Sequence, residues 1–147
     1  MKLAIILLML FVLFLFTTCD SPFVEDVYSI RMQNNINQPL SFTVSFNYPD
    51  TLIPADYNHL RGMPANRTVF YDSKKDWDKV FKEDLPRDTL SVFIFDAIII
   101  PDDWDEVLLE YKITKRYDLS LKDLECIGFT ITNPPNDNMR GIKVFPK

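Results

Sequence analysis

Acidic residues gather at one point of the sequence, where Asp102, Asp103, Asp105 and Glu106 follow Pro101. Clustered carboxylates could bind Ca²⁺, but a calcium loop needs alternating oxygen ligands and a glycine for its sharp turn. This segment contains no glycine, and its side chains would diverge on a helix. Proline near the first position and acids in the first turn are typical of a helix N-terminus. The pattern therefore predicts a helix here, with no metal and no cofactor.

The other residues that could do chemistry stand alone. His59 is the only histidine, and no nucleophile-elbow sequence accompanies it. Cys126 has no cationic neighbour fixed beside it in the sequence, so a packed or idle thiol, with no catalytic role, is expected. Three glycines in 147 residues leave no material for a phosphate-binding loop. We therefore assign no catalytic residue and favour a protein that is not an enzyme.

Composition indicates one globular, acidic domain. Hydrophobic residues make up 47% of the chain and charged residues 25%, which is unlike a disordered protein. The formal net charge is −5, and residues 19–147 hold 15 basic residues against 21 acidic ones, a net charge of −6. An acidic domain is a poor partner for a phosphate backbone, so nucleic-acid binding is not expected.

The first residues have the pattern of a secretory leader. Lys2 supplies a positive charge, and Leu3 to Phe16 is an unbroken apolar run of 14 residues. That run is shorter than the roughly 20 residues of a membrane-spanning helix and fits the apolar region of a signal peptide. Small residues and Cys19 follow at once.

This arrangement resembles a bacterial lipoprotein signal. The resemblance implies a diacylglyceryl group on the sulfur of Cys19 and cleavage just before that residue. We therefore expect a signal peptide at residues 1–18, a tether at 19–26 and a single β-rich domain at 27–147. An ordinary cleaved signal and an uncleaved N-terminal anchor are the alternatives. Several acyl chains would attach the protein stably to a membrane, where a single chain is marginal.

Alternation of apolar and polar residues predicts the main strands. Leu40 to Tyr48 alternates over nine residues, which predicts a strand with one buried and one wet face. Leu90 to Phe95 is apolar on both faces, as in a central strand that is covered on both sides. Short strands are expected at Val69 to Tyr71, Gly128 to Thr132 and Ile142 to Phe145.

Short amphipathic helices are predicted around the two tryptophans. Trp77 and Trp104 each begin an apolar i, i+3, i+4 pattern, so both should pack on a sheet. Ser73-x-x-Asp76 and Ser120-x-x-Asp123 have the spacing of a capping box at a helix start.

Residues 50–66 have no clean period and contain Pro54, Pro64 and Gly62, which predicts a long surface loop. Tyr57, close to His59 and Arg61 in this loop, is the best candidate for an exposed ligand contact.

A charged stretch at a predicted strand end offers no further ligand site. Lys115-Arg116-Tyr117-Asp118 is explained by a local ion pair of Arg116 with Asp118 or Asp123.

Two short segments resemble the Asp-Ser/Thr-apolar acceptor motif for O-glycans on exported Bacteroidetes proteins. They are Asp50-Thr51-Leu52 and Asp88-Thr89-Leu90, which makes Thr51 and Thr89 candidate glycosylation sites.

A longer pattern extends over most of the domain, and its most specific parts are Arg-Tyr-Asp-Leu-Ser-Leu-Lys-Asp-Leu at 116–124 and Thr-Ile-Thr-Asn-Pro-Pro at 130–135. In these segments the chain resembles a group of small secreted proteins and lipoproteins from Bacteroides and its relatives. The resemblance implies a location and a lineage, and it carries no activity.

Together these features predict a mainly β (α+β) fold, a single antiparallel β-sandwich-like domain with two or three short helices. The expected role is that of a lipid-anchored protein of the cell envelope, an outer-membrane lipoprotein that faces the periplasm or the cell surface and offers a binding or structural surface. Its expected partners are the membrane, through the lipid anchor, and an envelope protein or a glycan. The alternative is a small hydrolase that acts on glycan or cell-wall substrates.

Overall fold

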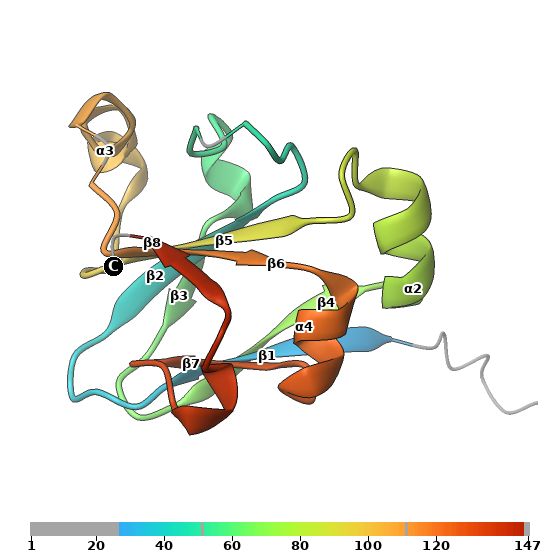
Figure 1. Ribbon diagram of the computed structural model, residues 1–147. Coiled ribbons are helices and arrows are strands. Elements are labelled where there is room, and N and C mark those ends of the chain that lie inside the picture. Colours follow the sequence, from blue (N-terminus) through green and yellow to red (C-terminus); the bar gives the residue numbers. More distant parts are fainter. Residues whose placement is uncertain (1–26, 51, 111, 146–147) are drawn as a thin grey trace, which may run out of the picture.

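Eight strands in two sheets form the framework of the protein (Figure 1). The computed structural model describes residues 27–50, 52–110 and 112–145, and the statements below refer to them. The strands are β1 (Tyr28–Asn34), β2 (Leu40–Ser45), β3 (Arg61–Met63), β4 (Thr68–Ser73), β5 (Leu90–Phe95), β6 (Lys115–Leu119), β7 (Thr130–Asn133) and β8 (Lys143–Phe145). The predicted mainly β fold is confirmed.

Short helices fill the connections between strands. The α-helices are α2 (Trp77–Lys79), α3 (Trp104–Glu110) and α4 (Leu121–Cys126). Shorter helical turns are η1 (Tyr57–His59), η2 (Val80–Asp84, a π-helix), η3 (Pro101–Asp103) and η4 (Asp137–Met139). Figure 1 shows α2 and α4 near the start of β1, and α3 on the far side of the larger sheet.

The two sheets differ in size and direction. The smaller has the order β4-β1-β7, with β4 antiparallel and β7 parallel to β1. The larger has the order β3-β2-β5-β6-β8 and is antiparallel throughout. Its edge strands, β3 and β8, have only three residues each, which limits the unpaired backbone that an edge presents.

The main hydrophobic core lies between the two sheets. Ile30 and Ile131 reach it from the smaller sheet, and Phe42, Val92 and Tyr117 reach it from the larger one. Trp77 and Leu124 close its ends from α2 and α4, at 3% and 0% exposure.

A second, smaller core covers the opposite face of the larger sheet. It joins Phe93 and Phe95 of β5 to Ile99, Trp104 and Val107. Both tryptophans are therefore core residues, as predicted.

This second layer corrects the prediction for β2. All six residues of β2 are buried, so Ser41, Thr43 and Ser45 do not form a wet face. Each of these hydroxyls has a hydrogen-bond partner. The Ser41 hydroxyl accepts from the Ile99 amide at 3.2 Å, the Thr43 hydroxyl donates to the His59 carbonyl at 3.4 Å, and the Ser45 hydroxyl accepts from the Asn47 amide at 3.2 Å.

The predicted long loop at 50–66 is also corrected, because it contains η1 and β3. Met63 of β3 pairs with Leu40 of β2 and is fully buried. A three-residue strand with glycine at its centre has too few side chains to show a period, which is why the sequence pattern missed it.

One predicted capping box is confirmed and one is wrong. At α4 the Ser120 hydroxyl accepts from the Asp123 amide, and the Asp123 carboxylate accepts from the Ser120 amide. At α2 the cap is Asp76, whose carboxylate accepts from the Asp78 amide, while the Ser73 hydroxyl accepts from the Lys75 amide in the preceding turn.

Candidate functional site

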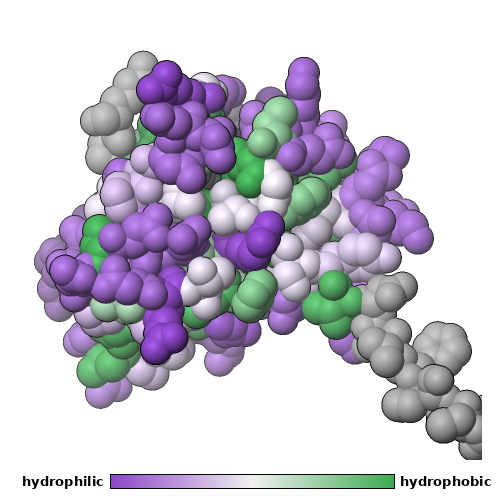
Figure 2. Space-filling view, turned by 90° about the horizontal axis from the view of Figure 1, so that it is seen from below, coloured by the Kyte–Doolittle hydropathy of each residue, from purple (hydrophilic) through white to green (hydrophobic). Residues whose placement is uncertain are grey.

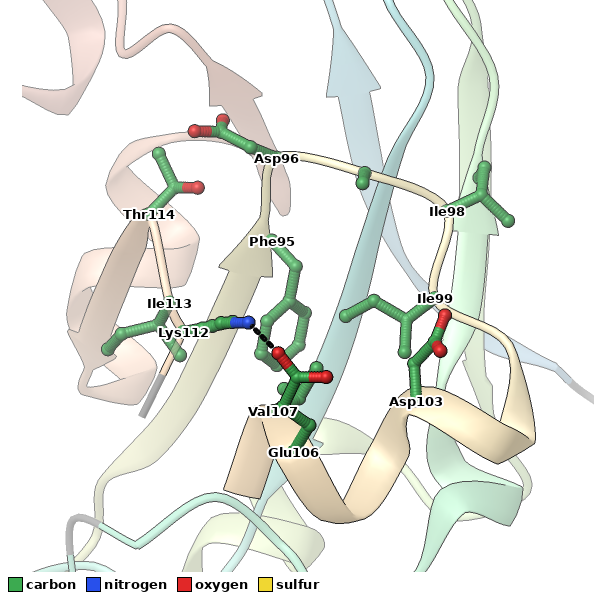
Figure 3. Close-up of a pocket in the computed structure, with 11 residues that line it drawn as sticks. Phe95, Asp96, Ile98, Ile99, Asp103, Glu106, Val107, Lys112, Ile113 and Thr114 are labelled. Carbon is green, nitrogen blue, oxygen red and sulfur yellow. Dashed lines mark hydrogen bonds and ion pairs between the residues drawn. The ribbon is translucent and has the colours of Figure 1, made fainter. Parts of the chain in front are cut away.

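A cavity of about 570 Å³ opens on the outer side of the larger sheet, beside α3. Its walls come from the end of β5, the connection at 96–100, the start of α3 and residues 112–114 (Figure 3). This volume is in the range of small-molecule binding pockets, about 300–1,000 Å³.

The wall nearest the sheet is apolar and firmly packed. Phe95, Ile99 and Val107 belong to the second core and are 1%, 8% and 5% exposed. Ile98 is 48% exposed and Ile113 is half-buried, so these two residues give the cavity its more accessible apolar surface.

Local sequence explains why the chain forms this hollow. After Phe95 the chain bends, and Pro101 occupies the first turn of η3, where its missing amide hydrogen costs nothing. Trp104 then holds the helix on the sheet, because its ring meets Phe95 edge to face at a centroid distance of 5.9 Å. Its indole N–H also donates to the Ala55 carbonyl at 3.0 Å.

The polar groups lie around the rim of the cavity. Asp103 is the last residue of η3 and Glu106 lies in the first turn of α3, which follows directly. Three residues apart, the two side chains lie on the same side of this helical segment. Figure 3 shows both side chains rising from the helix on the side of the cavity, with Phe95 behind Glu106. Asp96 and Thr114 line the opposite end of the cavity.

Lys112 is held at this rim by two glutamates. Its ammonium group donates to the Glu106 carboxylate, and it lies 2.9 Å from the Glu110 carboxylate. The hydrogen bond from Lys112 lowers the pKa of Glu106, and the hydrogen bonds to Glu106 and Glu110 raise the pKa of Lys112. Both groups are therefore charged at neutral pH.

The arrangement suits binding more than acid catalysis. A general acid needs a raised pKa, whereas Lys112 stabilises the ionised form of Glu106. An apolar wall with a few charged groups at its rim is the usual composition of a ligand pocket.

The structure does not bring the predicted contact residues Tyr57, His59 and Arg61 together at this pocket. Tyr57 is half-buried behind it, where its ring meets Trp104 edge to face and its hydroxyl donates to the Ile99 carbonyl at 3.1 Å. Tyr57 therefore supports the pocket wall.

His59 and Arg61 lie elsewhere on the surface. The His59 imidazole is 3.4 Å from the Asp56 carboxylate, with both side chains at least half exposed, and it lines a separate cavity of about 200 Å³ with Phe46. The Arg61 guanidinium donates to the carbonyls of Asn58 and Leu60. A ligand contact at these residues stays a prediction.

The other predicted sites are placed as follows. Cys19 and Thr51 lie outside the described residues. Thr89 is a half-buried residue, and its hydroxyl donates to the Arg87 carbonyl at 3.0 Å in the turn before β5. Cys126 is an exposed free thiol on α4.

The sequence pattern pointed to the acids of α3 but not to the pocket. Favourable charge at a helix N-terminus accounts for Asp102 and Asp105, which are exposed and do not line the cavity. The i, i+3 pairing of Asp103 with Glu106 beside the apolar Val107 was the available signal. The role of Lys112 could not be read from the sequence, since its position depends on how the chain leaves α3.

A second hollow of about 570 Å³ lies over β1 and β4, next to the exposed Val27 and Phe70. Figure 2, which views the side of β1 and β7, shows hydrophobic areas that are small and separated by hydrophilic ones. Among the described residues visible in this view, no continuous apolar patch of the kind that marks a protein interface is seen.

Comparison of the chain with models of known families, with curated proteins and with solved structures finds no match. Within the described ranges, none of the helices is long and apolar enough to span a bilayer. In the same ranges, no three His, Cys, Asp or Glu residues are grouped so that they could hold a metal ion.

Proposed function

We propose that this chain is a lipid-anchored binding protein of the cell envelope, attached through Cys19, with its ligand in the pocket beside α3. The cavity is the observation that supports binding most directly. Its apolar wall is held by Trp104 and Tyr57 before any ligand arrives, so little ordering is needed on binding. The anchoring is supported by the apolar run at residues 3–16 followed by Cys19.

Membrane fractionation tests the anchor. The wild-type protein should remain with membranes after a carbonate wash, and Cys19→Ala should abolish this and leave precursor or soluble protein. Cys126→Ala is the matched control and should fractionate like the wild type. If Cys19→Ala still resists the wash, residues 3–16 are acting as an uncleaved anchor and the lipid proposal is wrong.

A count of thiols gives an independent test. Acylation of the Cys19 sulfur leaves Cys126 as the one thiol of the mature chain, so the unfolded mature protein should react with one equivalent of Ellman's reagent. Two equivalents would contradict lipidation. The exposed Cys126 should also react in the folded protein.

Capture of ligands and partners tests the pocket. The native protein is purified from membranes, and its co-purifying envelope proteins, glycans and small molecules are identified by mass spectrometry. Ala97→Trp places an indole at the rim of the cavity and should remove a pocket ligand. Leu109→Trp is the control, because Leu109 is 87% exposed and does not line the cavity. Equal capture by both variants would place binding elsewhere.

A small hydrolase of glycan or cell-wall substrates is the alternative. Such an enzyme needs one carboxyl group kept protonated near a second that is ionised. Asp103 and Glu106 both line this pocket, three residues apart in the sequence, but Lys112 lowers the pKa of Glu106. Release of sugars from cell-wall material by the wild type, and its loss in Glu106→Gln, would favour the enzyme.

A further inference from the structure

We infer that the pocket beside α3 selects amphipathic cations, meaning small molecules with an apolar body and one protonated amine. The inference rests on the proposed binding role of this pocket and adds the chemical class of its ligand. The cavity and its apolar wall provide the binding, and the charges at the rim decide which ligands are accepted.

The rim carries more negative than positive charge. Asp96, Asp103 and Glu106 contribute three carboxylates, and Lys112 contributes the one ammonium group among the lining residues. That ammonium is already engaged by Glu106 and Glu110. An anionic ligand would have to displace a glutamate from Lys112 and would face the remaining carboxylates.

Asp103 is the group that can receive a cation. Its carboxylate accepts no hydrogen bond and forms no ion pair with any residue of the described ranges, whereas the Glu106 carboxylate already binds Lys112. Figure 3 shows the Asp103 side chain beside Ile99, on the side of Glu106 away from Lys112. A protonated amine placed there would meet a carboxylate at the edge of an apolar wall.

The apolar wall of the cavity determines the uncharged part of the ligand. Ile98 and Ile113 offer accessible side chains on two sides of the cavity, with Phe95 at its base. Burial of an aromatic or branched aliphatic body there is favourable at about 25 cal/mol per Å² of apolar surface. The net charge of −6 for residues 19–147 also raises the local concentration of cations at the surface.

Three probes with the same ring isolate the effect of charge. They are 2-phenylethylamine, its neutral isostere 2-phenylethanol, and the anion phenylacetate. The full chain, purified from membranes into nanodiscs of zwitterionic lipid, is labelled at isoleucine methyl groups. Binding is read from the NMR shifts of Ile98, Ile99 and Ile113, with Ile30 and Ile131 in the main core as internal controls.

The amine should shift the pocket methyls with a Kd about 5-fold lower than that of the alcohol, as expected for one exposed ion pair. Phenylacetate should bind more weakly than either. Asp103→Asn should remove most of the difference between amine and alcohol. Asp105→Asn, two residues further along in α3, is the matched control and should leave this difference unchanged, because Asp105 does not line the cavity.

A second variant should act in the opposite direction. Lys112→Met removes the ammonium group and frees Glu106, so amine binding should tighten by about 2-fold or more while alcohol binding changes little. This gain cannot be produced by a loss of folding.

Equal binding of amine and alcohol at the pocket methyls would overturn the inference and leave the binding role intact. Tighter binding of phenylacetate would do the same. If none of the three probes shifts the pocket methyls, the inference and the proposed pocket both fail.

Discussion

Arg116 and Asp118 form a buried ion pair on one face of β6, with Nε of the arginine 3.1 Å from Oδ1 of the aspartate. Their side chains are only 10% and 3% exposed. The Ser91 hydroxyl on the neighbouring β5 donates to the same carboxylate at 2.8 Å, and the guanidinium lies 4.4 Å from the centre of the Phe145 ring on β8. The pair thus links three adjacent strands of the larger sheet.

Breaking this pair should be strongly destabilising. Asp118→Asn removes the charge that faces Arg116 in a site with little water, and loss of one partner of a buried pair costs about 3–5 kcal/mol. The free energy of unfolding from urea titration measures the change. Asp137→Asn is the control, since Asp137 and Arg140 pair with side chains 88% and 82% exposed, and no measurable change is expected there. Similar losses in both variants would mean that burial of the Arg116 pair has no energetic effect.

The two tryptophans should respond differently to conservative replacement. Alanine at Trp77 or Trp104 should cost about 3–5 kcal/mol, because both side chains are buried. Phenylalanine should cost more at Trp104, where it removes the hydrogen bond to the Ala55 carbonyl, than at Trp77, whose indole N–H has no partner among the described residues. Urea titration of the two phenylalanine variants measures both losses. A larger loss of unfolding free energy in Trp77→Phe than in Trp104→Phe would contradict the prediction.

Tyr117 should make the protein sensitive to alkaline pH. Burial raises the pKa of its phenol to about 12, against about 10 for an unfolded chain. The unfolded state therefore loses this proton first, and the free energy of unfolding should fall as the pH rises from about 10 to about 12, with no effect of this group below pH 10.

Tyr117→Phe isolates that contribution. At pH 7 the change should be small or stabilising, because the Tyr117 hydroxyl has no hydrogen-bond partner in the described part of the chain. Urea titrations at pH 8 and pH 11 should show a smaller loss for this variant than for the wild type. Equal losses would assign the alkaline sensitivity to other groups.

Amide hydrogen exchange should divide residues 50–66 into two parts. β3 (61–63) pairs with β2 and Met63 is fully buried, so the β3 amides that hydrogen-bond to β2 should exchange slowly. Ala55 and Asp56 are exposed and outside any strand, so their amides should exchange faster. Uniformly fast exchange across both parts would mean that β3 is not held on the sheet.

Elements whose signal is local were predicted from the sequence. Every residue from Leu90 to Phe95 except Ser91 is apolar. The strand β5 has the same bounds, and all of its residues are buried, so both of its faces are covered. The Ser120–Asp123 capping box depends on two side chains three residues apart, and it forms as expected. The ion pair of Arg116 was predicted with either of two acids, and the geometry of β6 selects Asp118.

Other features depend on segments that are distant in the sequence, and only the tertiary structure decided them. The parallel pairing of β1 with β7 joins Arg31 to Thr130, far beyond the range of any periodic pattern. The alternation of β2 correctly describes the side chains that face the main core. The alternation could not show that η1 and the segment around α3 fold over the opposite face of β2. An alternating pattern shows which side chains of a strand are polar, but burial of the polar face depends on other segments of the chain. The pocket arises at the same second layer, where Lys112 meets Glu106 only because the chain turns back after α3.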